Sequence, residues 1–146
     1  MGLALKDSDL IFIDTAPFIY FFEKHPTYYN DMRRLFDLVY DKNIQVITSI
    51  ITYIEIATHP VRQGHPKLAI KYRDYFTHSE NISLFPIDLV IAEQTVELRA
   101  KYQLKTPDAI QIGTAVACGA DYIITNDKSW QILEPPLPAV LMVEEI

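Results

Sequence analysis

The chain has 146 residues, of which 49% are hydrophobic, so we expect one globular domain with a real core over residues 1–146. Its formal net charge of −6 excludes a general attraction to nucleic acid, and no uninterrupted apolar stretch is long enough to cross a membrane. The only cysteine, Cys118, excludes a disulfide framework and a thiolate metal cage, and the simple expectation is a reducing compartment, the cytoplasm.

Short apolar runs alternate with helical patterns along the chain. Strands are expected at residues 10–13, 44–47, 82–85, 122–124 and 139–143, the last of them at a sheet edge. Helices are expected at residues 16–25, 27–42, 50–59, 67–77, 89–102 and 107–118. This alternation, without a repeat or a linker, predicts an α/β fold with three layers and a mainly parallel central sheet.

Polar residues and prolines mark the ends of several helices. Thr15, Asp88 and Thr106 are each predicted to cap the helix that follows them. Ser49, or the threonine before it, is predicted to cap the third helix. Pro60 is predicted to end that helix, because proline lacks an N–H group and clashes with the preceding turn.

The segment from residue 106 to residue 127 places two acids at one edge of the sheet. Its helix of roughly a dozen residues spans roughly 18 Å, and its strand of about five residues spans roughly 17 Å. A tight turn at Gly119 joins them, so they run antiparallel, and the helix begins level with the end of the strand. Asp108 and Asp127 should therefore share the edge at which α/β sheets bind ligands.

Two further acids reach the same edge if the strands are parallel. Asp14 directly follows the first strand, whose carboxyl end lies at that edge. Glu55 lies nearly two turns into a helix that leaves the same edge, between Ile54 and Ile56. A carboxylate in so apolar a helix needs a partner if it is buried.

Each acid alone has an ordinary structural explanation. Asp14 and Asp127 have the character of turn or capping residues, and Asp108 in a first helical turn favours the helix dipole by about 0.3–1 kcal/mol. Together, four converging carboxylates without matching cations would repel one another. A divalent cation that prefers oxygen ligands, Mg²⁺ or Mn²⁺, would remove this repulsion, and both suit phosphate chemistry.

Four segments, spread over nearly the whole chain, occur in the order of a known family. They are residues 13–15, 48–55, 106–111 and 125–127. With these segments the chain resembles a PIN-domain ribonuclease of the VapC toxin type. The resemblance implies a PIN-like fold and an endoribonuclease that depends on Mg²⁺ or Mn²⁺ and leaves a 5′-phosphate and a 3′-hydroxyl. It also implies a small antitoxin as the common partner.

The resemblance further implies roles for individual residues. It assigns catalysis and metal binding to four acids, and support of the metal site to three neighbouring polar residues. The acids are Asp14, Glu55, Asp108 and Asp127, and the supporting residues are Thr15, Thr125 and Asn126. In this hypothesis the first three acids hold the ion directly or through water, and the fourth holds water or a second ion.

Two positions depart from the family pattern. Gly113 stands where the family's helix more often has alanine, a change that is expected to matter little. Ser129 stands where many members carry a further acid, just before the aromatic position that Trp130 keeps. The departure at Ser129 affects a second ion site more than it affects the first ion site.

Contacts with RNA phosphates are expected mainly from two lysines beside the acids, Lys105 and Lys128. Other basic residues have two open interpretations, a second RNA-binding strip or a solvated helix face. They are Arg62, His65, Lys67, Lys71 and Arg73. The aromatic residues in the ranges 18–22 and 28–29 are divided between the core and a surface for a homodimer or an antitoxin.

Other classes of protein remain open. A catalytically inactive PIN fold that serves as a binding module would keep this architecture, and the four intact acids speak against it. A phosphoacceptor receiver domain also gathers acids on a sheet edge, but Asp88 and Lys128 do not match its acceptor and its late lysine. No Gly-x-Gly-x-x-Gly motif follows the first strand, which argues against a dinucleotide enzyme.

Overall fold

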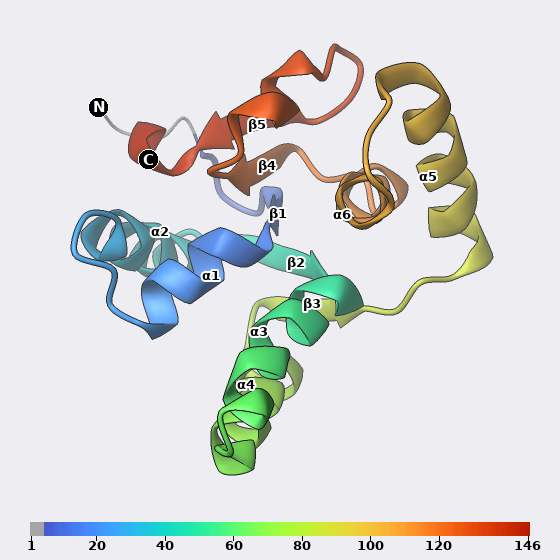
Figure 1. Cartoon of the computed structure of the whole chain (residues 1–146). Coiled ribbons are helices and arrows are strands. Elements are labelled where there is room, and N and C mark those ends of the chain that lie inside the picture. The colour runs from blue at the N-terminus through green and yellow to red at the C-terminus, as the bar shows by residue number, and fades with distance from the viewer. Residues whose placement is uncertain (1–4) are drawn as a thin grey trace.

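The computed structural model describes residues 5–146, which contain one five-stranded sheet (Figure 1). The strands are β1 (Leu10–Ile13), β2 (Gln45–Ser49), β3 (Ile82–Phe85), β4 (Tyr122–Thr125) and β5 (Ala139–Met142), in the spatial order β3-β2-β1-β4-β5. Every neighbouring pair is parallel, and β5 lies at an edge as predicted. The predicted α/β fold is therefore confirmed, while residues 1–4 of the predicted domain lie outside the described residues.

Six α-helices accompany the sheet within residues 5–146. They are α1 (Thr15–Phe22), α2 (Tyr29–Asp41), α3 (Ile50–Arg62), α4 (Pro66–His78), α5 (Leu89–Tyr102) and α6 (Thr106–Ala117). Two short 3₁₀ helices, η1 (Lys128–Ile132) and η2 (Val143–Glu145), follow β4 and β5. In this part of the chain no helix combines the length and the apolar character that crossing a membrane requires.

Neighbouring residues of the central strand point into two separate cores, and this makes three layers. Ile11 and Ile13 of β1 pack in a core with residues of α1, α2, α3 and α4. Phe12, which points to the other face, packs with residues of α5 and α6 and with Trp130 of η1. Figure 1 shows α1 and α2 on one side of the sheet and α5 and α6 on the other.

The carboxyl ends of the parallel strands share one edge of the sheet, and β1 lies in the middle of that edge. Ile13, the last residue of β1, is level with Ile124 of β4. The N–H group of Asp14 donates to the carbonyl of Ile124 at 2.9 Å, so the backbone itself holds Asp14 at this edge. Helix α3 begins directly after β2 and therefore leaves from the same edge.

Two predicted N-caps are wrong by one residue. The first helix is capped by Asp14 rather than Thr15, because the Asp14 carboxylate accepts a hydrogen bond from the N–H group of Thr15 at 2.7 Å. Thr106 is the first residue of α6 and not its cap. The cap is Lys105, whose backbone is extended and whose side chain makes no capping hydrogen bond.

The prediction that Pro60 ends the third helix is also wrong. Pro60 lies inside α3, and the helix continues to Arg62. Because it stands in the last turn, this proline removes only its own N–H group, and the short remaining turn tolerates that loss. The predicted caps Ser49 and Asp88 are confirmed, since each accepts a hydrogen bond from a backbone N–H group of its helix.

The structure gives Gly113 a packing role that the sequence did not suggest, because α6 approaches α5 closely at this glycine. A Cβ atom on Gly113 would lie 2.7 Å from Oγ1 of Thr95 and 3.2 Å from its backbone nitrogen. It would also lie 3.3 Å from the carbonyl oxygen of Ile91. The Thr95 hydroxyl already donates to that carbonyl at 2.8 Å, so moving it breaks a buried hydrogen bond.

The variant Gly113→Ala is expected to lower the free energy of unfolding by about 1–2 kcal/mol, although alanine favours helix formation. Urea denaturation of the wild type and the variant measures this difference. In a Thr95→Ala background the loss should be much smaller, because the closest contact has been removed. An equal loss in both backgrounds would contradict this packing role.

Candidate active site

Asp14 is at the centre of the carboxyl edge, where three groups hold its half-buried side chain. One carboxylate oxygen accepts from the N–H of Thr15 at 2.7 Å, and the other accepts from the Thr125 hydroxyl at 2.8 Å. The amide of Gln111 donates at 3.3 Å. Burial raises the pKa of Asp14 to about 6, although the bonds from Thr125 and Thr15 oppose it, and the charges of Glu55 and Asp108 raise it further.

Glu55 lies in the second turn of α3, and its side chain is exposed. An exposed carboxylate does not require a hydrogen-bond partner, but Glu55 has one. The hydroxyl of Thr15, at the start of α1, donates to Oε1 of Glu55 at 2.7 Å. Thr15 therefore contacts one acid through its backbone and another through its side chain, and this links Asp14 to Glu55.

Asp108 and Asp127 approach the site from α6 and from the turn after β4, as the lengths of those elements predicted. Burial raises the pKa of Asp108, the charges of Asp127 and Glu55 raise it further, and Lys105 opposes the shift. The N–H of Asp127 donates to Oγ1 of Thr125 at 3.0 Å. The Asp127 carboxylate accepts from the backbone N–H of Ser129 at 2.9 Å and from its hydroxyl at 2.7 Å.

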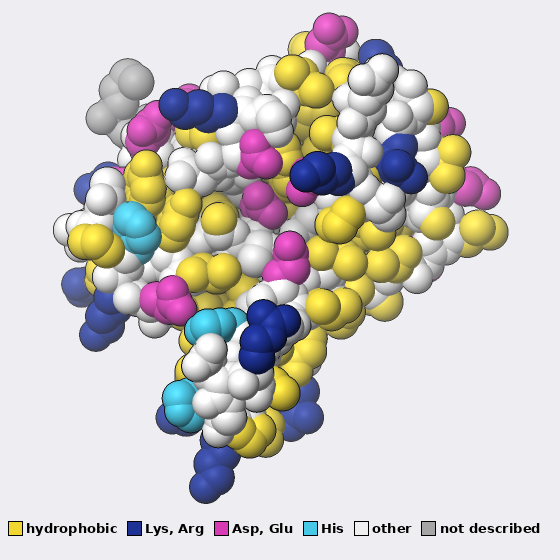
Figure 2. All heavy atoms as spheres, viewed as in Figure 1, with side chains coloured by type: hydrophobic (Ala, Val, Ile, Leu, Met, Phe, Trp, Pro, Cys, Tyr) yellow, Lys and Arg dark blue, Asp and Glu magenta, His cyan; other side chains and the backbone are white. Residues whose placement is uncertain are grey.

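The four acids therefore form one electrostatic group. Asp14 feels the charges of Glu55 and Asp108, and Asp108 feels those of Asp127 and Glu55. Figure 2 shows acidic side chains gathered near the middle of one face of the molecule. The two ion pairs found within residues 5–146 join Arg34 to Asp31 and Arg73 to Asp74, so neither neutralises this group.

The donor set of this group fits a hydrated Mg²⁺ or Mn²⁺ ion in charge and chemistry. All of the donors are oxygen atoms, and the pKa values of Asp14 and Asp108 are raised first by burial and then by the charges of the neighbouring acids. Among the described residues, no three acidic, histidine or cysteine side chains come close enough to enclose an ion directly. Because Mg²⁺ usually keeps several of its waters, ligation partly through water fits this spacing.

A buried network of neutral polar side chains, most of which the sequence motifs do not single out, lies beneath the acids. The Gln111 amide of α6 donates to Oγ1 of Thr15 at 3.0 Å and to Oγ1 of Thr52 at 3.1 Å. Thr48 donates to the carbonyl of Ile13 at 2.8 Å and lies 2.8 Å from the Thr52 hydroxyl. Thr48, Thr52 and Gln111 are almost fully buried. Buried polar groups are nearly always hydrogen-bonded, and these three satisfy one another.

Gln111 sets the direction of the hydrogen bonds in this network. Because its amide nitrogen can only donate, the Thr15 oxygen must accept from it, and the single Thr15 proton is left to point at Glu55. The same nitrogen lies 3.3 Å from Oδ1 of Asp14, the longest of its three contacts, so its two protons are shared among three oxygens. Gln111 thus positions two acids from different elements. A glutamine inside an otherwise apolar helix face was the sequence signal for it.

The variant Gln111→Met is expected to weaken Mn²⁺ binding roughly 10- to 100-fold, because residues that orient metal ligands have effects of this size. Isothermal titration calorimetry measures the affinity. Thr114→Val is the matched control, since Thr114 is also buried on α6 but its hydroxyl donates only to the carbonyl of Ile110. Equal affinities in both variants would show that Gln111 has only a packing role.

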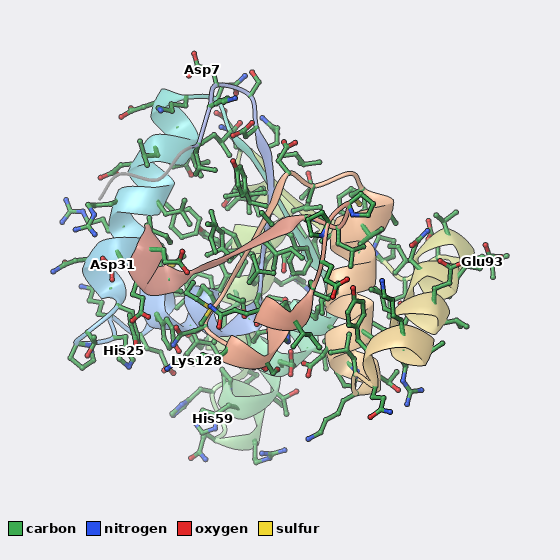
Figure 3. All side chains as sticks on the ribbon, turned by 90° about the horizontal axis from the view of Figure 1, so that it is seen from above. Asp7, His25, Asp31, His59, Glu93 and Lys128 are labelled. Carbon is green, nitrogen blue, oxygen red and sulfur yellow. The ribbon has the colours of Figure 1, made fainter. Side chains whose placement is uncertain are left out.

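The remaining residues predicted near the site occupy its border. The Asn126 amide donates to the hydroxyl of Tyr20 at 2.9 Å, which ties the end of β4 to α1, and within residues 5–146 it makes no hydrogen bond to an acid. Lys105 lies near enough to Asp108 to lower its pKa, and Lys128 is exposed at the start of η1. Figure 3 shows Lys128 and His59 at the same side of the molecule.

The second basic strip has the exposure of a solvated helix face. Its members lie at the end of α3, in the turn before α4, and along α4, and all are exposed. Arg73 makes an ion pair with its neighbour Asp74 at 3.8 Å. His65 differs from the others because it lines a cavity next to Glu55.

Comparisons with solved structures identify the fold. A toxin–antitoxin complex from Klebsiella pneumoniae matches with a TM-score of 0.67 at 23% identity, covering 93% of this chain and 99% of that one. VapBC2 from Rickettsia felis, bound to a promoter DNA fragment, matches with a TM-score of 0.71 at 19% identity, covering 91% and 98%. VapC20 from Mycobacterium tuberculosis, a toxin that cleaves the sarcin–ricin loop, matches with a TM-score of 0.64 at 17% identity, covering 88% and 99%. At identities this low, the TM-scores show that the chain shares the fold of these proteins.

The sequence comparison gives the family. No curated protein is similar enough to count as a relative. The family model of the PIN domain, however, matches residues 11–134, which hold all four acids. The predicted resemblance is confirmed, and the receiver-domain alternative is excluded. The chain belongs to the PIN domain family.

Proposed function

We propose that this chain is a metal-dependent endoribonuclease that hydrolyses RNA phosphodiester bonds as the toxin of a toxin–antitoxin pair. The observation that supports this best is the convergence of four acids, without a matching cation, on the carboxyl edge of a PIN-family sheet. Perturbed carboxyl groups of this kind cluster at functional sites. In a binding module without catalysis Asp14 could still cap α1, but that role alone would not call for three further acids beside it.

The acids would hold Mg²⁺ or Mn²⁺ at the carboxyl edge of the sheet, with ligands from the end of β1, from α3 and from α6. We assign Asp14, Glu55 and Asp108 as ligands, directly or through water, and Asp127 as the holder of a water molecule or a second ion. When bound, the ion supplies an activated water for in-line attack and stabilises charge on the phosphate. The carboxylate of Asp127, held by two bonds from Ser129, is suited to orient that water.

The supporting residues fix the ligands before the substrate arrives. Thr125 donates to Asp14 and accepts from the N–H of Asp127, so it couples the ends of β1 and β4. The Thr15 hydroxyl holds Glu55. Lys105 flanks Asp108 and would contact the RNA phosphates beside the cleaved bond, as would Lys128 on the other border.

The partners of this function are an RNA substrate, an antitoxin protein and a second copy of the chain, all in the cytoplasm. The similar structures from Klebsiella pneumoniae and Rickettsia felis are complexes of a toxin with its antitoxin, and this supports the second partner. An apolar outer face on α5 supports the homodimer. Leu89, Val90 and Val96 on this helix are 73%, 59% and 67% exposed.

Cleavage of a mixed RNA pool by the purified protein tests the proposal. Cuts are expected with Mn²⁺ or Mg²⁺ and should disappear when a chelator is added, because the acids alone cannot activate water. Analysis of the product ends should find a 5′-phosphate and a 3′-hydroxyl. A 2′,3′-cyclic phosphate would show attack by the ribose hydroxyl and would rule out the metal-bound water.

A further inference from the structure

A cavity of about 500 Å³ opens beside Glu55, between α1, α3 and α4. Its walls are mainly apolar and aromatic, with Phe22 from α1 and both Leu68 and Tyr72 from α4. The rings of Phe22 and Tyr72 stack with centroids 4.8 Å apart and planes 22° apart. A cavity of this size and lining suits a small planar group better than a charged one.

Four polar side chains also line this cavity and are free to bind a ligand. They are Glu23, His59, Gln63 and His65. Within residues 5–146 none of the four side chains donates or accepts a hydrogen bond, in contrast to Glu55, which accepts from Thr15. A few unpaired polar groups around an aromatic wall are the usual composition of a ligand site.

We propose that this cavity binds one nucleobase of the RNA, adjacent to the bond that the acids cleave. The inference rests on the proposed ribonuclease function for its substrate. A planar base would extend the stack of Phe22 and Tyr72, and stacking of unpaired bases on aromatic side chains is a common means of RNA recognition. Because Glu55 belongs to both the acid group and the cavity wall, the base lies within a nucleotide of the cleaved phosphate.

The chemistry of the cavity selects among the bases and favours guanine. Glu23 offers two acceptor oxygens. It lies close to Tyr72, because its charge adds to the rise in the pKa of the Tyr72 phenol that burial mainly causes. Guanine presents two neighbouring N–H donors on its pairing edge, N1–H and the exocyclic amino group. Each other base places an acceptor beside its donor. The two carboxylates that line the cavity, Glu23 and Glu55, repel a phosphate group.

The test is a nuclear magnetic resonance titration of the metal-free protein with guanosine, inosine, adenosine, cytidine and uridine in the presence of a chelator. Guanosine is expected to shift the resonances of residues that line the cavity and to bind more tightly than the other four. Inosine is the sharpest comparison because it lacks only the exocyclic amino group. Nucleosides carry no phosphate, so neither the ion nor cleavage contributes to the result.

Two variants locate the site. Tyr72→Leu should weaken guanosine binding about tenfold, the size of one base–aromatic stack. Tyr75→Leu is the matched control, because Tyr75 also touches Phe22 from α4, with centroids 5.0 Å apart, but does not line the cavity. Glu23→Gln should abolish the preference for guanosine over inosine, and since Glu23 is exposed this variant carries the test if Tyr72→Leu does not fold.

Equal guanosine affinity in Tyr72→Leu and Tyr75→Leu would overturn the proposal. So would the absence of nucleoside binding, and a basic apolar peptide that shifted the same resonances would then identify a protein-docking site. Guanosine binding by a protein that cleaves no RNA would uphold the base site while removing the proposed function. Metal-dependent cleavage without any nucleoside binding would uphold the proposed function and overturn the base site.

Discussion

The variant Asp108→Asn should lose at least about 100-fold of its RNA cleavage while remaining folded. Asparagine keeps the shape of the side chain but removes a charge that would stabilise the ion, and a loss of several kcal/mol in transition-state stabilisation corresponds to this factor. The structural loss is small. A first-turn acid contributes only about 0.3–1 kcal/mol through the helix dipole, and removing it relieves repulsion from Asp127 and Glu55.

Cleavage assays on a fixed RNA, combined with thermal unfolding, measure both effects. Asp88→Asn is the matched control, because Asp88 caps α5 and has no part in the acid group. It should cleave RNA at the rate of the wild type. Full activity of Asp108→Asn that is still sensitive to a chelator would remove Asp108 from the ligand set. Full activity of Asp108→Asn that a chelator does not inhibit would show that no metal ion takes part in cleavage.

The second large effect is one of stability, and it arises at Asp14. The pKa of this half-buried carboxyl is raised from the ordinary 3.8 to about 6, mainly by burial. Asp14→Asn should therefore raise the free energy of unfolding of the metal-free protein by about 2 kcal/mol at pH 7.5. For a chain of this length that corresponds to a rise in Tm of roughly 5 °C.

The pH dependence follows from the direction of this shift. Between pH 3.8 and about 6, the folded protein keeps a proton on Asp14 that the unfolded chain has lost. Stability therefore falls as the pH rises through this window, and the penalty is complete above it. At pH 3.5 the carboxyl is protonated in the folded state and mostly protonated in the unfolded chain, so the advantage of Asp14→Asn should nearly disappear there.

Thermal unfolding at pH 3.5 and 7.5, in the presence of a chelator, measures the effect. Asp88→Asn again serves as the control, because it also replaces an acidic N-cap but leaves the acid group intact. Adding Mn²⁺ should stabilise the wild type and leave Asp14→Asn nearly unchanged, since binding to the folded state alone raises stability. A variant less stable than the wild type at pH 7.5 would show that the Asp14 charge is already compensated.

The two effects share one physical cause, which is uncompensated negative charge. The site holds its acids in place with neutral donors, namely Thr15, Thr125 and Gln111, instead of with lysine or arginine. Neutral donors orient a carboxylate without neutralising it. A cation therefore retains its full attraction to the site, and the metal-free protein is less stable as a result.

The sequence by itself determined the alternation of strands and helices, the parallel sheet and the edge that carries the acids. These features depend on local patterns: apolar runs of strand length, helical periodicity and the lengths of neighbouring elements. The antiparallel arrangement of α6 and β4, which brings Asp108 level with Asp127, needed only the two lengths and a tight turn. Each of these signals lies within some twenty residues of chain.

Only the tertiary structure decided what depends on contacts between distant segments. Gln111 contacts Thr15 and Thr52, which lie 96 and 59 residues away, so the local pattern marks it as an unusual polar residue but cannot name its partners. The close approach of α5 and α6 at Gly113, and the cavity between α1, α3 and α4, likewise arise from packing. Local sequence specifies which face of an element is apolar, but the atoms that meet across elements are set by side-chain packing of the whole chain.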